Sequence, residues 1–347
     1  MWRCLELARL GGGYTAPNPM VGAVLVYEDR VIGEGYHQVY GQAHAEVNCV
    51  NSVAAEDVPL ISRSTMYVSL EPCAHFGKTP PCADLVIRMR IPKVVVGCRD
   101  PFPQVNGKGI EKLLAAGVEV RVGVLEAECM ELNRRFFTFN TLHRPYIVLK
   151  WAQSSNGRIA GAGLVNSREV RERVFISNEY TNRLVHKWRS EEAAILVGTR
   201  TALADDPSLT VRLWSGPDPI RLVIDKELTL PASLKLFDGK VRTIVFNMVK
   251  HEEVGNLSYY QLANDSSLVH QICQALYQLK IQSVLVEGGA RLLQSFIDEG
   301  YWDEARVITN NELELPGGLP APLLSGVKGR DEFLFSDTIR YYKQETR

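Results

Sequence analysis

The sequence lacks an excess of charge of either sign. Its 347 residues include 39 lysines and arginines and 40 aspartates and glutamates, so the formal net charge at pH 7 is −1. A protein that binds the phosphates of DNA, of RNA or of an anionic membrane usually has an excess of lysine and arginine side chains. The composition therefore predicts neither a nucleic-acid partner nor a membrane partner.

Long apolar runs and a regular set of cysteines are also missing. No apolar stretch approaches the roughly 20 residues that a membrane-spanning helix needs. The first nine residues, MWRCLELAR, carry charges where a secretory signal has its apolar core. The 7 cysteines are odd in number and scattered, which is typical of reduced thiols. We therefore expect a cytoplasmic protein.

The hydrophobic pattern predicts two α/β domains. Short strands that are apolar throughout alternate with helical patterns, which indicates largely parallel sheets covered by helices on both faces. The polar connector at 141–144 separates two series of strands, so we place a first domain at residues 1–143 and a second at residues 144–347. The expected strands are 21–27, 65–70, 93–97, 118–122, 146–151, 193–198, 220–224, 243–246, 283–286 and 305–308.

Three residues of the first domain are candidate zinc ligands. His44 stands two residues before Glu46, in the first turn of a helix expected at 43–55. Cys73 follows an expected strand, and Cys82 opens an expected helix. One imidazole and two thiolates suit tetrahedral zinc with a fourth position left for water. Zinc lowers the pKa of bound water to about 7, and Glu46 is placed to move the proton. His75 is the one neighbour that would close the site into a structural one.

These residues resemble the cytidine-deaminase-like superfamily, whose signature is H-x-E followed by P-C-x-x-C. Here eight residues instead of two separate the cysteines, and the run EPCAHFGKTPPC (71–82) looks like the first domain of the bifunctional riboflavin-biosynthesis deaminase/reductase family. The segments PNPMVG (17–22), GEGYH (33–37) and DPFPQVNGKG (100–109) match the same family. The resemblance implies a cytidine-deaminase-like, three-layer α/β/α domain that holds one zinc ion, with Glu46 as its catalytic residue.

The insert between the two cysteines predicts a phosphate-binding loop in the deaminase. It carries His75, Lys78 and Thr79 together with free backbone N–H groups, and a metal would tether it at both ends. We expect these residues to bind the ribose phosphate of the substrate, with a solvated polar turn as the alternative. Asn18 fits an amide contact to the pyrimidine, and it fits turn chemistry between two prolines equally well.

The second half lacks the G-x-G-x-x-G pattern of a standard dinucleotide-binding fold. Instead, a buried strand ends at Glu287-Gly288-Gly289, and a helix follows whose backbone N–H groups can meet a phosphate. The segment 195–212 continues from an expected strand into an acidic pair beside proline, flanked by threonines and arginines. This pattern predicts a polar loop, with an Asx-type turn that carries exposed charges as the alternative. This segment and the runs 150–160 and 186–190 resemble the reductase domain of the same family, which has a dihydrofolate-reductase-like α/β fold.

The resemblance implies NADPH as the second cofactor and a set of reductase site residues. Guanidinium groups suit a phosphate because they can bind it with two hydrogen bonds. The residues expected to bind the reductase substrate are Arg189, Leu209, Arg212 and Glu287. The residues expected to bind the cofactor are Ala152, Thr201, Asp205, Gly288, Gly289, Ala290, Arg291, Leu292 and Leu293.

One position departs from the family. Asn156 replaces the aspartate that many members carry before Gly157. If that carboxylate supplies a proton, this reductase is weakened; if the residue only shapes a turn, asparagine serves as well. The charged segment 163–175 also matches the family poorly, and we assign it no role.

The expected function is two successive steps of riboflavin synthesis. The first is zinc-dependent deamination of 2,5-diamino-6-ribosylamino-4(3H)-pyrimidinone 5′-phosphate, and the second is NADPH reduction of the ribosyl group to a ribityl chain. We expect a homo-oligomer that acts on this small molecule. The alternatives are a deaminase with an impaired reductase half, a nucleic-acid deaminase, and a zinc-stabilised nucleotide-binding protein. The balanced charge argues against the second, and Glu46 argues against the third because a structural zinc site does not need it.

Overall fold

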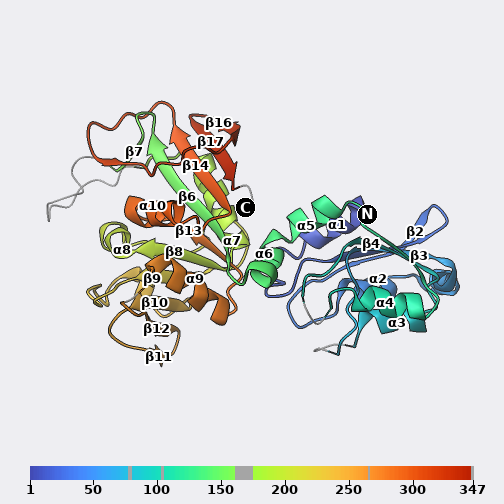
Figure 1. Ribbon diagram of the computed structural model, residues 1–347. Coiled ribbons are helices and arrows are strands. Elements are labelled where there is room, and N and C mark those ends of the chain that lie inside the picture. The colour runs from blue at the N-terminus through green and yellow to red at the C-terminus, as the bar shows by residue number, and fades with distance from the viewer. Residues whose placement is uncertain (77–79, 103–104, 161–174, 265, 345–347) are drawn as a thin grey trace. The chain divides into compact units, whose positions relative to one another are not determined.

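The chain folds into two units, each with its own sheet. The computed structural model describes residues 1–76, 80–102, 105–160, 175–264 and 266–344. The first unit is Met1–His143 and the second is Arg144–Arg347 (Figure 1). None of the helices within the described ranges is long and apolar enough to cross a membrane.

The first unit contains a five-stranded sheet with the order β2-β1-β3-β4-β5. Its strands are β1 (Gly22–Tyr27), β2 (Arg30–Tyr36), β3 (Thr65–Leu70), β4 (Lys93–Cys98) and β5 (Glu119–Val122). Strands β3, β4 and β5 are parallel, whereas β1 is antiparallel to both β2 and β3. The prediction of a largely parallel sheet is therefore wrong for the β1–β2 side.

Strand β2 is absent from the predicted strands because two glycines interrupt its apolar pattern. Both glycines lie against the helix α2 (Ala45–Asn51). A Cβ on Gly33 would lie 2.6 Å from the carbonyl oxygen of Cys49, and a Cβ on Gly35 would lie 2.2 Å from the backbone nitrogen of Cys49. Close packing of the helix on the hairpin therefore requires the residues that weaken the strand signal.

Helices cover both faces of this sheet, which gives the first unit three layers (Figure 1). Besides α2, they are α1 (Trp2–Arg9), the 3₁₀ helix η1 (Ala55–Arg63), α3 (Cys82–Arg88), α4 (Lys108–Ala115), α5 (Glu126–Leu132) and α6 (Arg134–Leu142). Leu25 packs in a core with residues of α2, α3 and α4, whereas its neighbour Val24 packs with residues of α1. This alternation places successive side chains of β1 on opposite faces. The predicted three-layer α/β/α architecture is confirmed.

The second unit contains a ten-stranded sheet with the order β11-β12-β10-β9-β8-β13-β6-β14-β17-β16. Its strands are β6 (Tyr146–Ser154), β8 (Ala194–Gly198), β9 (Ile220–Ile224), β10 (Thr243–Asn247), β11 (Glu252–Val254), β12 (Leu257–Gln261), β13 (Ser283–Val286), β14 (Glu304–Asn310), β16 (Gly329–Leu334) and β17 (Asp337–Lys343). The strands from β12 to β14 in this order are parallel. Antiparallel strands, β11 on one side and β17 with β16 on the other, complete the sheet. A separate pair joins β7 (Arg158–Ala160) to β15 (Leu319–Pro320).

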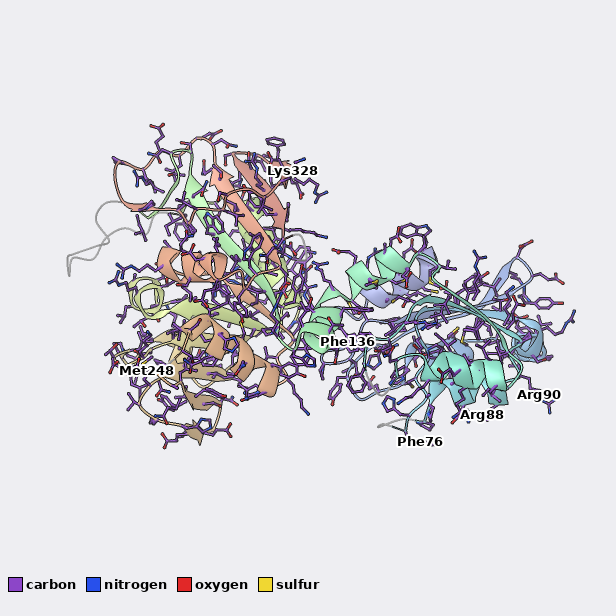
Figure 2. All side chains as sticks on the ribbon, in the orientation of Figure 1. Phe76, Arg88, Arg90, Phe136, Met248 and Lys328 are labelled. Atoms are coloured by element: carbon purple, nitrogen blue, oxygen red, sulfur yellow. The ribbon has the colours of Figure 1, made fainter. Side chains whose placement is uncertain are left out.

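Helices also cover both faces of the second sheet. They are α7 (Glu179–Glu191), α8 (Thr199–Asp205), the 3₁₀ helix η2 (Lys235–Phe237), α9 (Leu268–Gln278) and α10 (Ala290–Asp298). One core contains buried residues of α9 and α10, and the opposite face is covered by residues of α7 and α8. Side chains fill the space between sheet and helices in both units (Figure 2). The predicted α/β class is confirmed for this unit as well.

Gly22 offers a direct test of the packing of α1 on β1. A Cβ at this position would lie 2.0 Å from the carbonyl oxygen of Cys4 in α1, and backbone atoms cannot move aside cheaply. We expect Gly22→Ala to lower the free energy of unfolding by about 3 kcal/mol, measured by chemical denaturation. The control is Gly198→Ala, where the new Cβ would lie 3.9 Å from its nearest neighbour, Leu292. A Gly22→Ala protein as stable as the parent would contradict this packing.

Candidate zinc centre and reductase site

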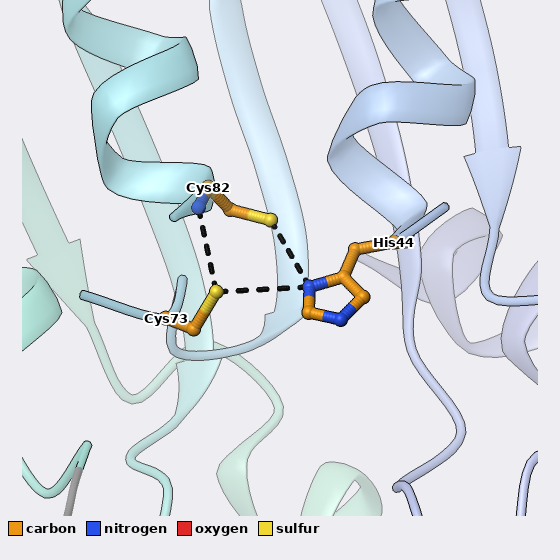
Figure 3. Close-up of side chains that lie close together, drawn as sticks. All are labelled: His44, Cys73 and Cys82. Atoms are coloured by element: carbon orange, nitrogen blue, oxygen red, sulfur yellow. Dashed lines mark hydrogen bonds between the residues drawn. The ribbon is translucent and has the colours of Figure 1, made fainter. Parts of the chain in front are cut away.

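The ends of three elements bring the candidate zinc ligands together. His44 is the N-cap residue of α2, Cys73 follows β3, and Cys82 is the first residue of α3. Their ligand atoms all lie within 4.8 Å of one another, and His44 Nδ1 is 3.3 Å from Cys82 Sγ and 3.6 Å from Cys73 Sγ (Figure 3). A tetrahedral zinc ion keeps such ligand atoms about 3.5 Å apart. The three side chains therefore fit zinc.

The surroundings of Cys73 favour its thiolate form, which is the form that binds metal. The thiol of Cys82 and then the imidazole of His44 lower the pKa of Cys73 by hydrogen bonding. The backbone N–H of Cys82 also donates to Cys73 Sγ, at 3.3 Å. His75 does not join the clustered ligand atoms within the described part of the chain. The structure therefore does not support closure of the site by His75.

Glu46 lies in the first turn of α2, one residue inside the helix that His44 caps. Its side chain is buried, and burial, followed by the charge of Cys73, raises the pKa of its carboxyl. A carboxyl with a raised pKa can both accept and release a proton near neutral pH. The helix begins at Ala45, so His44 is the cap rather than part of the first turn as predicted.

Asn18 lies beside this centre and is held by His37, a residue that we did not predict from the sequence. The Nδ2 group of Asn18 donates to His37 Nε2 at 3.1 Å, while His37 Nδ1 faces the carbonyl oxygen of Ala43 at 3.0 Å. Burial lowers the pKa of His37, so the ring is neutral and donates through Nδ1. The rings of His37 and His44 lie 5.5 Å apart. Asn18 also forms the expected turn, because its backbone N–H donates to the carbonyl oxygen of Thr15.

Glu71 holds a second loop against the zinc centre and was also missed. Its buried carboxylate accepts hydrogen bonds from four backbone N–H groups in the segment 100–110. Gly109 lies so close that a Cβ there would be 1.8 Å from the carbonyl oxygen of Pro72. The sequence signal was the run 100–109, which matched the family but carried no assigned role. The four donor residues are Asp100, Gly107, Gly109 and Ile110.

The predicted phosphate loop is described only in part, because Lys78 and Thr79 lie outside the described residues. His75 has a buried Nδ1 atom with no hydrogen-bond partner, and its ring lies 6.3 Å from that of Phe102. The next residue, Phe76, is 78% exposed (Figure 2).

The predicted cofactor residues of the second unit gather at the carboxyl ends of β6, β8 and β13. Ala152 lies on β6, Thr201 and Asp205 lie on α8, and Gly289 is the N-cap residue of α10. A Cβ on Gly288 would lie 2.9 Å from the Thr201 side chain, and Gly289 has φ +77°. Glycine is therefore required at this turn, where the N–H groups of α10 can receive a phosphate. The turn fits the phosphate of a nucleotide cofactor.

Two details differ from the expectations for this region. The segment 195–212 is not one polar loop, because α8 occupies Thr199–Asp205. The side chains of Leu292 and Leu293 are buried in the core, so only their backbone can face the cofactor. Ala290 and Arg291 stand with them in the first turns of α10.

The predicted substrate residues Arg189 and Glu287 form a largely buried ion pair, with side chains 13% and 8% exposed. Arg189 Nε lies 2.8 Å from Glu287 Oε1, and Nη2 lies 2.6 Å from Oε2. Burial alone would raise the pKa of Glu287, but the charges of Arg189 and Lys150 outweigh it and lower the pKa to about 2. Glu287 is therefore ionised at neutral pH, and three of the five N–H groups of Arg189 are engaged, the third on the carbonyl oxygen of Thr210 at 3.4 Å.

Leu209 and Arg212 have contrasting environments. Leu209 is buried in the core, with its backbone at φ +50°, so only its main chain is available to a ligand. Such a left-handed conformation is costly for leucine and is often found at functional loops. Arg212 is exposed, and its Nη1 donates to Thr210 Oγ1 at 3.1 Å. Arg212 is therefore better placed than Arg189 to bind an incoming phosphate.

Asn156 uses its whole amide group in the structure. Its Oδ1 accepts from Ser154 Oγ at 2.6 Å and from the backbone N–H of Leu315 at 3.3 Å. Its Nδ2 donates to the carbonyl oxygen of Leu315 at 3.0 Å. The residue thus ties the turn after β6 to a distant segment, and an aspartate could not donate the last of these bonds.

Comparisons with known proteins agree with this geometry. The zinc-binding region of cytidine and deoxycytidylate deaminases matches residues 1–98, and the RibD C-terminal domain matches residues 145–311. The riboflavin biosynthesis protein RibD of Aquifex aeolicus is 42% identical over 304 residues, which cover 86% of this chain and 82% of that protein. RibD of Escherichia coli K12 is 36% identical over 323 residues, covering 88% of this chain and 84% of its own.

A solved structure is similar over the whole chain. The diaminohydroxyphosphoribosylaminopyrimidine deaminase/5-amino-6-(5-phosphoribosylamino)uracil reductase of Thermotoga maritima has a TM-score of 0.86 and 35% identity, covering 99% of this chain and 97% of that protein. The resemblance predicted from the sequence is confirmed. The chain belongs to the RibD family of riboflavin biosynthesis enzymes, which join a zinc-dependent deaminase to an NADPH-dependent reductase.

Proposed function

We propose that His44, Cys73 and Cys82 bind the zinc ion of the deaminase and that Glu46 moves protons beside it. The observation that carries this proposal is the approach of the three ligand atoms to within 4.8 Å of one another, next to a buried carboxyl. The substrate is 2,5-diamino-6-ribosylamino-4(3H)-pyrimidinone 5′-phosphate. Water replaces its C2 amino group, which leaves as ammonia.

Each proposed site residue of the first unit has a distinct role in the deamination. Zinc, when bound, supplies a water molecule that is acidic enough to lose a proton near neutral pH. Glu46 takes that proton and returns it to the departing nitrogen, a role that its raised pKa supports. Asn18 binds the pyrimidine with an amide that His37 orients. His75, Lys78 and Thr79 bind the phosphate, and the unpartnered Nδ1 of His75 supports its share of this role.

The second unit reduces the ribosyl group of the deaminated product. NADPH supplies the hydride for C1′ of the opened sugar. The turn at Gly288 and Gly289 and the start of α10 bind the cofactor, together with Ala152, Thr201 and Asp205. Arg212 binds the phosphate of the substrate, and the Arg189–Glu287 pair and the backbone of Leu209 complete the wall of the site. The proximity of Thr201 to the glycine turn supports this assignment.

Asn156 supports a working reductase rather than an impaired one. Its amide satisfies both backbone groups of Leu315, so its role in this chain is to hold a turn. An amide does not supply protons near neutral pH, so a working reductase takes its proton from another group.

We also propose a cytoplasmic homo-oligomer that acts on this small molecule and not on nucleic acid. All seven cysteines are free thiols, which supports a reducing compartment. The edge strand β16 is exposed, with Phe333 75% exposed, and such an edge favours pairing with another copy.

Glu46→Gln tests the deaminase assignment. We expect ammonia release to fall by about 100- to 10,000-fold, because the amide cannot shuttle the proton. Zinc content and melting temperature stay close to those of the parent. Reduction of the deaminated substrate by the same protein serves as the internal control and does not change. Ammonia release at the parent rate would refute the role of Glu46.

Arg212→Ala tests the phosphate contact of the reductase. Loss of a charge-assisted hydrogen bond should raise KM for the deaminated substrate by about 10- to 100-fold, with a smaller change in kcat. Arg183→Ala, which removes another exposed arginine of the same unit, is the control. Arg189→Ala is a poorer test because it leaves the buried Glu287 without its counter-charge. An unchanged KM in Arg212→Ala would show that the phosphate binds elsewhere.

Asn156→Asp tests whether Asn156, which stands where many family members have aspartate, serves only to hold the turn. The carboxylate loses the donor to the Leu315 carbonyl, so we expect the free energy of unfolding to fall by about 1–3 kcal/mol and NADPH oxidation to slow. Asn256→Asp removes a similar bond, from Nδ2 to the carbonyl oxygen of Gly239 at 2.9 Å, but at an exposed turn where water can replace it, so stability should change less and NADPH oxidation should not change. A variant that oxidises NADPH faster than the parent would instead assign proton supply to this position.

A further inference from the structure

One face of α7 presents two residues to the same loop, and only one of them has a role so far. His186 and Arg189 are three positions apart, so they lie on one side of the helix. Arg189 reaches the carbonyl oxygen of Thr210 at 3.4 Å, and His186 Nδ1 accepts the backbone N–H of Arg212 at 3.0 Å. The imidazole is 1% exposed, so this hydrogen bond forms away from bulk water.

The loop is held at three successive residues. Between the two contacts from α7, the backbone N–H of Val211 donates to Asp218 Oδ1 at 2.6 Å. Leu209, just before them, places its side chain in the core with a left-handed backbone. The main chain of this loop is therefore fixed from both sides, while the Arg212 side chain is exposed.

His186 stays uncharged in this environment. Burial, and then the charges of Arg189, Arg212 and Lys150, lower its pKa to about 4, against an opposing effect of Glu287. A neutral imidazole has one nitrogen that accepts and one that donates. Because Nδ1 accepts from Arg212, the proton is on Nε2. The uncharged ring therefore accepts a hydrogen bond in a region that already contains the positive charges of Arg189, Arg212 and Lys150.

We propose that His186 is a positioning residue of the reductase, which fixes the main chain of Arg212 so that its guanidinium meets the phosphate of the substrate. This inference rests on the proposed function, in which Arg212 binds that phosphate. A histidine that served only to fill the core would be replaceable by any residue of suitable size. A positioning histidine requires an acceptor at the place of Nδ1.

Three substitutions separate these roles. Asparagine places an amide oxygen where Nδ1 lies, glutamine places it about where Nε2 lies, and alanine removes the acceptor. In the full zinc-loaded chain, we expect His186→Ala and His186→Gln to raise KM for the deaminated substrate by about tenfold. We expect His186→Asn to remain within about twofold of the parent, and kcat to change less than KM in all three. Ammonia release by the first unit reports the amount of active chain in each sample, and thermal melting reports whether the second unit, which carries the substitution, is folded.

A second measurement, of ligand binding, does not require turnover. Binding of ribose 5-phosphate at the site that Arg212→Ala removes, measured by calorimetry, should weaken in His186→Ala and His186→Gln and persist in His186→Asn. Equal KM and equal affinity in the parent and His186→Ala would overturn the proposal, and so would rescue by glutamine as complete as rescue by asparagine. If the parent oxidises no NADPH, the proposed function fails, and the binding series still decides the role of His186.

Discussion

The proposed deaminase site depends on holding one imidazole and two thiols close enough to share a metal ion. His44 caps α2, Cys73 follows β3 and Cys82 opens α3, so three separate elements must end at the same place. The backbone N–H of Cys82 and the carboxylate of Glu71 stabilise this arrangement, one by donating to a ligand sulfur and the other by fixing the neighbouring loop. Zinc binding and folding of this edge are therefore coupled.

In the reductase half, an ion pair and hydrogen bonds, rather than a cluster of metal ligands, hold the proposed site residues in place. The site proposed there is organised by a largely buried ion pair, Arg189 with Glu287, and by hydrogen bonds between a loop and α7. Desolvation of the two charges opposes formation of such a pair, and removal of either partner leaves an uncompensated charge in the interior. The pair therefore favours one arrangement of the groups around it. In both halves, the side chains that we propose as substrate contacts rely on other residues that hold the backbone.

Much of the fold, and the gathering of His44, Cys73 and Cys82, could be predicted from the sequence because short buried runs and specific motifs carry the signal. That these three residues bind zinc stays a prediction. The strands 65–70, 220–224 and 283–286 were predicted to the residue, as expected for short runs that are buried throughout. The edge strands β11 and β16 were missed because they are exposed and carry no apolar pattern. Glu71 and His186 were missed because their hydrogen-bond partners lie 26 or more residues away in the sequence. The roles of Lys78 and Thr79 stay predictions.

The central claim is that one chain performs deamination and then reduction on the same substrate. The most direct measurement supplies the zinc-loaded protein with the diaminopyrimidinone ribosylamine phosphate and NADPH, and follows ammonia and NADPH together. The account predicts that ammonia appears first and that NADPH is then consumed in an equal amount. NADPH oxidation without prior ammonia release, or no ammonia from the zinc-loaded chain, would contradict it.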